Sequence, residues 1–227
     1  MELAAYRDLC LDAVDVAAVA SFWAQATGRP VEARADGGAV VRGGPLRELR
    51  INPVPESKAV KNRVHLDLHV PDVRDLVVLG ATVLADHGRW QVLADPEGNE
   101  LCAFPAPAQD VPDAPARPFA ICVDSDRPVE LAAWWHGVLG GHLGPGPDGR
   151  PRWLHDAAGL DGVILKAVQV EDARRAKNRC HWDVTARDVG ALVAAGATVL
   201  RPPGADLAWT VLADPQGNEF CALAPEG

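Results

Sequence analysis

Hydrophobic and polar residues alternate over short stretches of the chain and recur at helical spacing over one longer stretch near the N-terminus. The segment RDLCLD, residues 7–12, alternates as a half-buried strand does. Behind Asp15, the expected N-cap, the apolar residues of positions 16–27 recur with the period of a helix, and Gly28 ends the pattern. Apolar runs separated by glycine pairs then predict three strands, near residues 31–34, 39–42 and 46–54.

The same order of elements returns later in the first half of the chain. A strand is expected at 64–70 and a short helix after Asp72, followed by strands near Thr82, at 90–94 and at 100–104. The stretch DPEGN, which begins at Asp95, consists of turn-forming residues and predicts a tight turn before the last strand. The first half therefore predicts two successive β-α-β-β-β units.

An internal repeat extends this prediction to the second half. KNRVHLD at 61–67 returns as KNRCHWD at 177–183, and VLADPEGNELCAF from Val92 returns as VLADPQGNEFCAL from Val211. A period near 115 residues indicates a duplicated domain, because solenoid repeats span only about 20–50 residues. The segment between the copies is rich in proline and predicts a linker. We expect one domain at 1–104, a linker at 105–117 and a second domain at 118–227.

The acidic composition narrows the range of partners. Lys and Arg number 22 against 31 Asp and Glu, a formal net charge of −9, so nucleic acid is not expected as a partner. The N-terminal residues lack the pattern of a signal peptide. The longest uncharged run, 131–147, is broken by glycines and prolines and is shorter than the ~20 residues that span a membrane. Five scattered cysteines are typical of buried, reduced thiols. We expect a cytoplasmic monomer or homodimer that binds no membrane.

Three duplicated motifs resemble those of the vicinal oxygen chelate superfamily, which includes glyoxalase I, bleomycin-resistance proteins and extradiol dioxygenases. They are the SFW and AWW segments at 21–23 and 133–135, the KNRxHxD motif, and VLADPxGNExCA. The resemblance implies an α+β fold in which four βαβββ units pair into two cupped, incomplete mixed β-barrels, with the helices outside. It also implies two cavities, one in each half of the chain.

The resemblance suggests where a divalent metal such as Zn, Ni, Mn or Fe would bind. Metal-using members place a His or Glu on the first strand of a unit and a Glu on its last strand. Counting back seven positions from each helix-capping Asp gives His65 and Asp8, whereas the second half has Ala120 and His181 at the matching positions. Cys102 and Cys221 stand at the usual positions of the last-strand Glu. The metal ligands expected in the first half are Asp8, Glu48, His65 and Glu100.

Two functions stay open at the level of sequence. The first is a metal-assisted enzyme of the lyase, isomerase or dioxygenase type that uses the first cavity, with Glu100 moving a proton. The second is a metal-free protein that binds a drug or metabolite, as bleomycin-resistance proteins do. Candidates for ligand binding in either case are Lys61, Arg63, Cys102, Trp153, His181, Trp182 and Glu219.

Each of these residues also has a structural interpretation. His65 can pair with Asp67 along its strand, and Glu100 can accept hydrogen bonds from the DPEGN turn or pair with Arg63. The KNR segments can be solvated loops, and the tryptophans can fill the core. Fold alone does not decide between these interpretations and a functional role.

Overall fold

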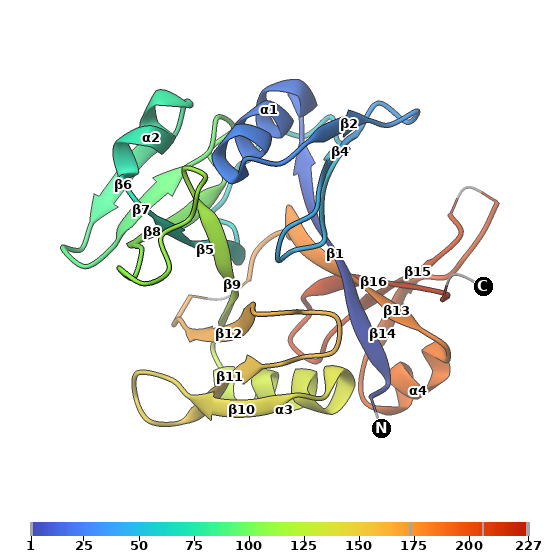
Figure 1. The fold of residues 1–227 in the computed structure, drawn as a ribbon. Helices are drawn as coiled ribbons and strands as arrows, with labels where there is room; N and C mark the ends of the chain where they lie inside the picture. The colour runs from blue at the N-terminus through green and yellow to red at the C-terminus, as the bar shows by residue number, and fades with distance from the viewer. Residues whose placement is uncertain (1, 173, 206, 226–227) are drawn as a thin grey trace.

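The computed structural model describes residues 2–172, 174–205 and 207–225, and it contains four βαβββ units in chain order (Figure 1). Unit 1 consists of β1 (Ala4–Ala13), α1 (Val16–Thr27), β2 (Val31–Ala33), β3 (Ala39–Arg42) and β4 (Glu48–Pro53). Unit 2 consists of β5 (Val64–Val70), α2 (Val73–Val78), β6 (Thr82–Asp86), β7 (Gln91–Ala94) and β8 (Glu100–Pro105). The predicted order of elements in the first half is confirmed.

The second half repeats this arrangement. Unit 3 consists of β9 (Arg117–Ser125), α3 (Pro128–Leu139), β10 (His142–Pro145), β11 (Pro151–His155) and β12 (Ile164–Gln169). Unit 4 consists of β13 (Cys180–Ala186), α4 (Val189–Ala194), β14 (Thr198–Arg201), β15 (Thr210–Ala213) and β16 (Glu219–Leu223). None of the helices in the described part of the chain is long and apolar enough to cross a membrane.

The boundaries of α1 follow from its capping residues. The side chain of Asp15 accepts a hydrogen bond from the backbone N–H of Ala18 at 2.9 Å, which satisfies one of the free N–H groups at the start of the helix. Gly28 ends the helix with φ 63°, a left-handed conformation that glycine adopts without steric cost. Both signals were readable in the sequence.

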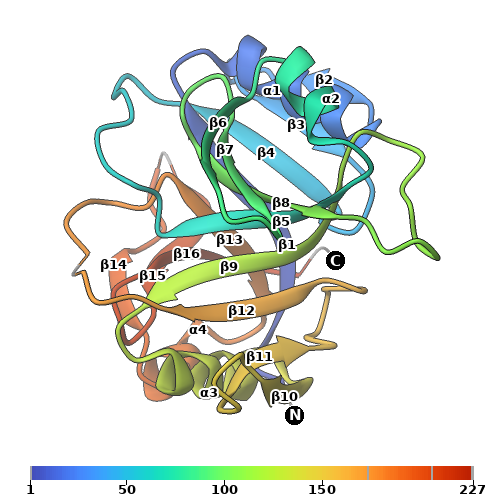
Figure 2. The same ribbon diagram turned by 90° about the vertical axis from the view of Figure 1, so that its left-hand side faces the viewer.

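The units pair across the two halves of the chain to form two eight-stranded sheets. Sheet A has the order β14-β15-β16-β13-β1-β4-β3-β2 and joins units 1 and 4, because β1 pairs antiparallel with β13. Sheet B has the order β10-β11-β12-β9-β5-β8-β7-β6 and joins units 2 and 3 through β5 and β9. Figure 2 shows β12, β9, β5 and β8 side by side in sheet B.

This pairing corrects the expectation of one cavity in each half. Each sheet contains one unit from the first half and one from the second, so each concave face is shared between the halves. The physical reason is that β1 and β5 can each bury an open edge against a strand of either half. The alternation of residues along a strand specifies its buried face but not its neighbour.

Helices cover one face of each sheet and leave the other face free for polar side chains. The helix α1 lies against β3 and β4, and α3 lies against β11 and β12. On β1, Leu9 and Leu11 belong to the apolar core, whereas Asp8 and Cys10 alternate with them and point to the opposite face. We call these opposite faces cup A, on sheet A, and cup B, on sheet B.

In each half of the chain, one tryptophan–aspartate contact connects the two units of that half. The indole N–H of Trp23 on α1 donates to Asp95 Oδ2 at 3.3 Å, and that of Trp135 on α3 donates to Asp214 Oδ2 at 3.2 Å. Both aspartates begin the DPxGN turns and also accept backbone N–H groups within the turn. The helical tryptophans therefore anchor the core, and the four units form a ring that alternates sheet pairing with these contacts.

Candidate functional site

Cup A contains a cluster of side chains that could bind a metal. Cys10 on β1 lies opposite His181 on β13, and Asp183 is two residues further along β13 on the same face. One potential ligand atom from each of the three lies within 4.8 Å of the other two. The thiol of Cys221, on the neighbouring strand β16, lies 3.8 Å from His181 Nε2. These residues come from units 1 and 4.

Cup B contains the corresponding cluster from units 2 and 3. His65 on β5 lies opposite Cys122 on β9, and Asp67 shares their face. Their ligand atoms also lie within 4.8 Å of one another. Because Cys122, His65 and Asp67 are the repeat counterparts of Cys10, His181 and Asp183, the duplication has produced two equivalent clusters.

The two clusters differ in the cation beside them. Arg50 on β4 lies opposite Cys10, and Lys166 on β12 lies opposite Cys122, so the two cations occupy equivalent positions. Lys166 Nζ is 2.9 Å from Asp67 Oδ2 across the strands of cup B. Arg50 instead faces acidic groups of its own unit, with Nε 3.6 Å from Asp8 Oδ2 and Nη1 3.4 Å from Glu48 Oε2.

Two substitutions between the repeats explain this difference. Ala120 and Ile164 stand in the second half at the positions of Asp8 and Glu48. Without those carboxylates Lys166 has no acidic neighbour on its own unit, and it pairs with Asp67 of unit 2. The cation beside the cluster of cup B therefore pairs with the carboxylate of that cluster, whereas the equivalent cation of cup A pairs with Asp8 and Glu48.

Cup A also contains buried polar atoms that have no hydrogen-bond partner among the described residues. Asp183 is 8% exposed, and neither its Oδ1 atom nor Nδ1 of His181 has a hydrogen-bond partner within the described part of the chain, although His181 Nε2 lies 3.7 Å from Asp183 Oδ1. A buried carboxylate oxygen without a hydrogen-bond donor is costly, and such atoms in a native protein call for an explanation. Burial, and after it the negative charge of Asp183, raises the pKa of the Cys10 thiol well above its usual range.

The ionisable groups of cup B are mutually compensated. Burial favours the neutral form of Asp67, but hydrogen bonding to His65 and the charge of Lys166 outweigh it and lower the pKa of this carboxyl. Burial also opposes charging of His65, yet the neighbouring Cys122 and Asp67 raise the pKa of the imidazole well above its usual range. The cluster thus consists of an anion between two cationic groups.

Aromatic rings surround Lys166 in cup B. Its Nζ lies 4.4 Å from the ring centre of Phe119 and 5.0 Å from that of Trp153, distances at which a cation interacts favourably with a π face. Phe104 stands 5.5 Å from Phe119, and Trp90 stacks on Phe104 at 5.7 Å. All four rings are half-buried, so they offer a partly open aromatic surface.

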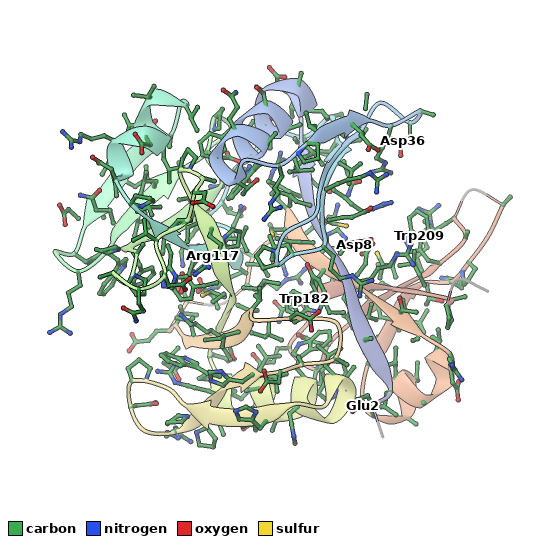
Figure 3. All side chains as sticks on the ribbon, in the orientation of Figure 1. Glu2, Asp8, Asp36, Arg117, Trp182 and Trp209 are labelled. Atoms are coloured by element: carbon green, nitrogen blue, oxygen red, sulfur yellow. The ribbon has the colours of Figure 1, made fainter. Side chains whose placement is uncertain are left out.

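Cup A has no comparable wall. Trp209 is the repeat counterpart of Trp90, but Arg7 and Leu223 stand where cup B has Phe119 and Phe104. Figure 3 labels Asp8, on β1, and Trp209, which immediately precedes β15; both strands belong to sheet A. The cups have therefore diverged in both charge and aromatic content.

The four-residue metal site expected in the first half is not formed. Asp8 and Glu48 belong to sheet A, whereas His65 and Glu100 belong to sheet B. They are separated because the two units of the first half contribute to different sheets. His65 and His181 likewise lie in different cups.

Glu100 and Glu219 have structural partners. Glu100 pairs with Lys58 at 2.8 Å and accepts the backbone N–H of Asn62 at 3.1 Å. Glu219 pairs with Arg174 and accepts the N–H of Asn178 at 3.2 Å. Each glutamate thus ties the loop that precedes β5 or β13 to the sheet, and neither belongs to the two clusters.

The remaining candidates fall into three places. Trp182 is buried in the core with its ring 4.8 Å from that of Trp135, on the face of β13 opposite to His181, so it walls neither cup. Trp153 and Cys102 lie in cup B, where Cys102 contacts His65. Lys61 and Arg63 lie outside both cups, in the loop before β5.

Sequence reasoning missed Cys10, Cys122, Asp183 and Lys166 as members of a site. A signal existed, since Cys10 and Cys122 occupy the same position of two equivalent first strands, two residues after Asp8 and Ala120. Strand alternation puts them on the face of the first-strand ligand position. The sequence did not show which strands lie beside β1 and β9.

Comparison with known proteins identifies the class. The model of the glyoxalase-like domain matches residues 8–104 and again residues 120–223. The chain therefore belongs to the glyoxalase-like domain family of the vicinal oxygen chelate superfamily, with two tandem modules.

Solved structures agree with this fold. Glyoxalase I from Zea mays is 14% identical, with a TM-score of 0.68 over 97% of this chain and 92% of that chain. The cppA protein from Streptococcus pneumoniae is 8% identical, with a TM-score of 0.53 over 97% of this chain and 100% of that chain. At these identities the similarity concerns the fold alone. No curated protein sequence matches the chain.

Proposed function

We propose that this protein acts on a small oxygenated molecule with the help of a divalent metal held in cup A. The observation that supports the proposal is the buried carboxylate of Asp183, whose Oδ1 has no hydrogen-bond partner among the described residues, beside His181 and Cys10. Proteins of this fold bind small molecules, which makes a concave face the expected place for one.

The donors of cup A fit a metal ion, and those of cup B do not. Cys10, His181 and Asp183 would hold the ion, and sulfur, imidazole and carboxylate together favour zinc among the common divalent ions. A bound divalent ion would supply polarisation of a carbonyl or enolate oxygen. In cup B the ammonium of Lys166 already neutralises Asp67, so a second cation there would be repelled.

Asp8 is the residue of cup A best suited to move a proton. It lies opposite Asp183 on the paired strands. Burial, and then the charge of Glu48, raises the pKa of its carboxyl, while Arg50 opposes the shift. A carboxyl with a raised pKa accepts and returns a proton more readily near neutral pH. Arg50 would orient an oxyanion of the substrate beside it.

The direct test is metal binding by matched histidine variants. After equilibrium dialysis against zinc, we expect wild type and His65→Ala to retain one equivalent and His181→Ala to retain none. The two histidines are repeat counterparts at the same strand position, so each variant controls for the other. Retention of zinc by His181→Ala, or no stoichiometric zinc in wild type, would contradict the proposal.

A second candidate function is metal-free binding of a flat organic anion in cup B. The observation that favours it is Lys166, which is 8% exposed and makes one hydrogen bond within the described residues, to Asp67, although an ammonium group has three donors. A ligand carboxylate or phenolate would take a free donor while its ring stacks on Phe104 or Trp90.

Tryptophan fluorescence can test this candidate with defined probes. Benzoate and salicylate should quench the emission of wild type and of Arg50→Met in a saturable way, but not that of Lys166→Met. The arginine variant removes the equivalent cation of cup A and is the matched control. Equal quenching of both variants would contradict binding at Lys166. A cytoplasmic location and a monomeric or homodimeric state are further proposals, based on the acidic, sparsely cysteine-containing sequence.

A further inference from the structure

A cavity of about 600 Å³ lies between the two halves of the chain, outside both cups. The loop before β5 and the loop before β13 enclose it, and each contributes one copy of the KNR motif, at 61–63 and 177–179. We call this cavity the seam pocket. The duplication thus brings two identical basic motifs to one cavity from opposite sides.

Cations outnumber carboxylates among the residues that line the seam pocket. The basic side chains are Lys61, Arg63, Arg175, Lys177 and Arg179, and the acidic ones are Asp12, Glu56 and Asp172. Asp124 and Glu97 pair with Lys61 and Arg179 from outside the lining, so the excess of positive charge is confined to the residues that line the cavity.

Each of the two lysines of the KNR motifs pairs with one carboxylate and keeps an accessible ammonium group. Lys61 pairs with Asp124, and Lys177 pairs with Asp12 at 2.6 Å, which are equivalent contacts in the two halves. Their side chains are 53% and 63% exposed, so the ammonium groups remain accessible beside their carboxylate partners. An ammonium group has three donors, and one carboxylate does not use them all.

The two arginines retain donors that nothing in the described residues accepts. Arg63 is 8% exposed; its Nη2 donates to the backbone carbonyl of Asp172, but its buried Nη1, 3.8 Å from Asp124 Oδ2, has no hydrogen-bond partner. Arg179 is held by Glu97 at 2.9 Å and by the carbonyl of Asp12, yet its buried Nε has no partner either. Buried guanidinium N–H groups without an acceptor are costly, and they keep positive charge behind the lining of the pocket, whereas the exposed ammonium groups of Lys61 and Lys177 are the groups that an anion reaches directly.

We propose that the seam pocket binds a small multivalent anion, one that presents phosphate or carboxylate groups toward both KNR motifs. Apolar residues also line the cavity, among them Val54 and Val60, so a short apolar body between the anionic groups would fit as well. This site is separate from the proposed metal and organic-ligand sites of the cups. Its occupant would bridge units 2 and 4, which belong to different sheets.

Calorimetric titration of the full chain at low salt tests the proposal with two probes, inorganic pyrophosphate and citrate. Wild type should bind at least one of them saturably, and the double variant Lys61→Ala/Lys177→Ala should bind it about tenfold more weakly or not at all, because two charge-assisted contacts are lost. Both lysines are exposed but their partners Asp124 and Asp12 are buried, so a thermal unfolding curve of the double variant, recorded beside the titration, checks that it is folded. Binding of only one probe would identify the anionic group that the pocket prefers.

A charge-matched control separates the pocket from general electrostatics. Arg74 and Arg187 are exposed and lie outside the pocket, and Arg74→Ala/Arg187→Ala removes the same number of positive charges. This control should bind the probe as wild type does, as should Lys166→Met and His181→Ala of the cups. Absence of saturable binding of both probes to wild type, or equal weakening in the two double variants, would overturn the proposal.

Discussion

At the scale of the residue, the surroundings of one cation distinguish the two cups. Lys166 and Arg50 occupy equivalent positions, but Asp8 and Glu48 hold Arg50 on its own unit, while Ala120 and Ile164 leave Lys166 to pair with Asp67. A buried carboxylate needs a cation or donors close by. The duplicated cluster therefore has a lysine paired with its carboxylate in cup B, whereas in cup A the equivalent arginine pairs with Asp8 and Glu48 instead.

The buried pair of Lys166 and Asp67 leads to a stability prediction. Lys166→Met should lower the free energy of unfolding by about 1.5–3 kcal/mol, because it removes the charge-assisted hydrogen bond to the buried Asp67 and leaves His65 as the remaining cationic partner. The double variant Lys166→Met/Asp67→Asn should recover most of this loss, since the buried charge is then removed as well. Urea denaturation of the wild type and the variants measures both effects. Additive losses in the double variant would contradict the coupling.

A second residue-scale prediction concerns Cys122 and alkaline pH. Burial raises the pKa of this thiol to about 11, above its ordinary value near 9. Between these two values the unfolded chain has released the proton that the folded chain still binds, so stability falls as pH rises through this window. Cys122→Ala should reduce the slope of unfolding free energy against pH by about 1.4 kcal/mol per unit. An unchanged slope in denaturation from pH 9 to 11 would contradict it.

At the scale of the element, the docking of a loop of unit 3 onto β1 stabilises sheet A near its cluster. The backbone N–H of Tyr6 donates to the carbonyl of Ala158 at 2.7 Å, next to the irregularity of β1 between Tyr6 and Asp8. Gly159 approaches so closely that a Cβ would lie 2.2 Å from the Tyr6 carbonyl oxygen. Only glycine permits this approach.

Gly159 and Gly162 form a matched pair for testing that contact. Both have positive φ, 86° and 72°, but a Cβ on Gly162 would meet nothing within 4 Å. Gly162→Ala should cost about 1–2 kcal/mol of stability from backbone strain alone. Gly159→Ala should cost at least twice as much, because the clash with backbone is added. Chemical denaturation measures the two values, and equal losses would show that the close approach is not required.

The sequence predicted the elements well and their neighbours poorly. Alternation, caps and turn residues indicated β1, α1 and the DPxGN turns, because these depend on local spacing. The open edge of β1 could pair with β5 or with its repeat counterpart β13, and both pairings would bury the same side chains of β1. For that reason the sequence grouped Asp8 with His65, whereas the structure brings Asp8 beside Asp183.

At the scale of the whole molecule, four units form a closed ring. Sheets join unit 1 to unit 4 and unit 2 to unit 3, while the Trp23–Asp95 and Trp135–Asp214 contacts join the units of each half. Neither half contains a complete sheet. Each cup, and the seam pocket as well, therefore depends on both halves.

This arrangement predicts that the isolated first half, residues 1–104, dimerises. Alone, it would expose the edges of β1 and β5 that pair with β13 and β9 in the full chain. Since β13 is the repeat counterpart of β5, two copies of the fragment can pair β1 with β5 in both directions. Light scattering should give twice the mass of the fragment. A folded monomer would contradict the cross-half pairing.

We infer that the cation beside each cluster decides which cup binds a metal. The zinc stoichiometry of Lys166→Met tests this inference most directly. Removing the ammonium takes away the cation that distinguishes cup B from cup A and leaves His65, Asp67 and Cys122 with the contacts that His181, Asp183 and Cys10 have in cup A. We expect one equivalent of zinc in wild type and two in Lys166→Met, the second lost again when His65→Ala is added. A stoichiometry that Lys166→Met leaves unchanged would contradict it.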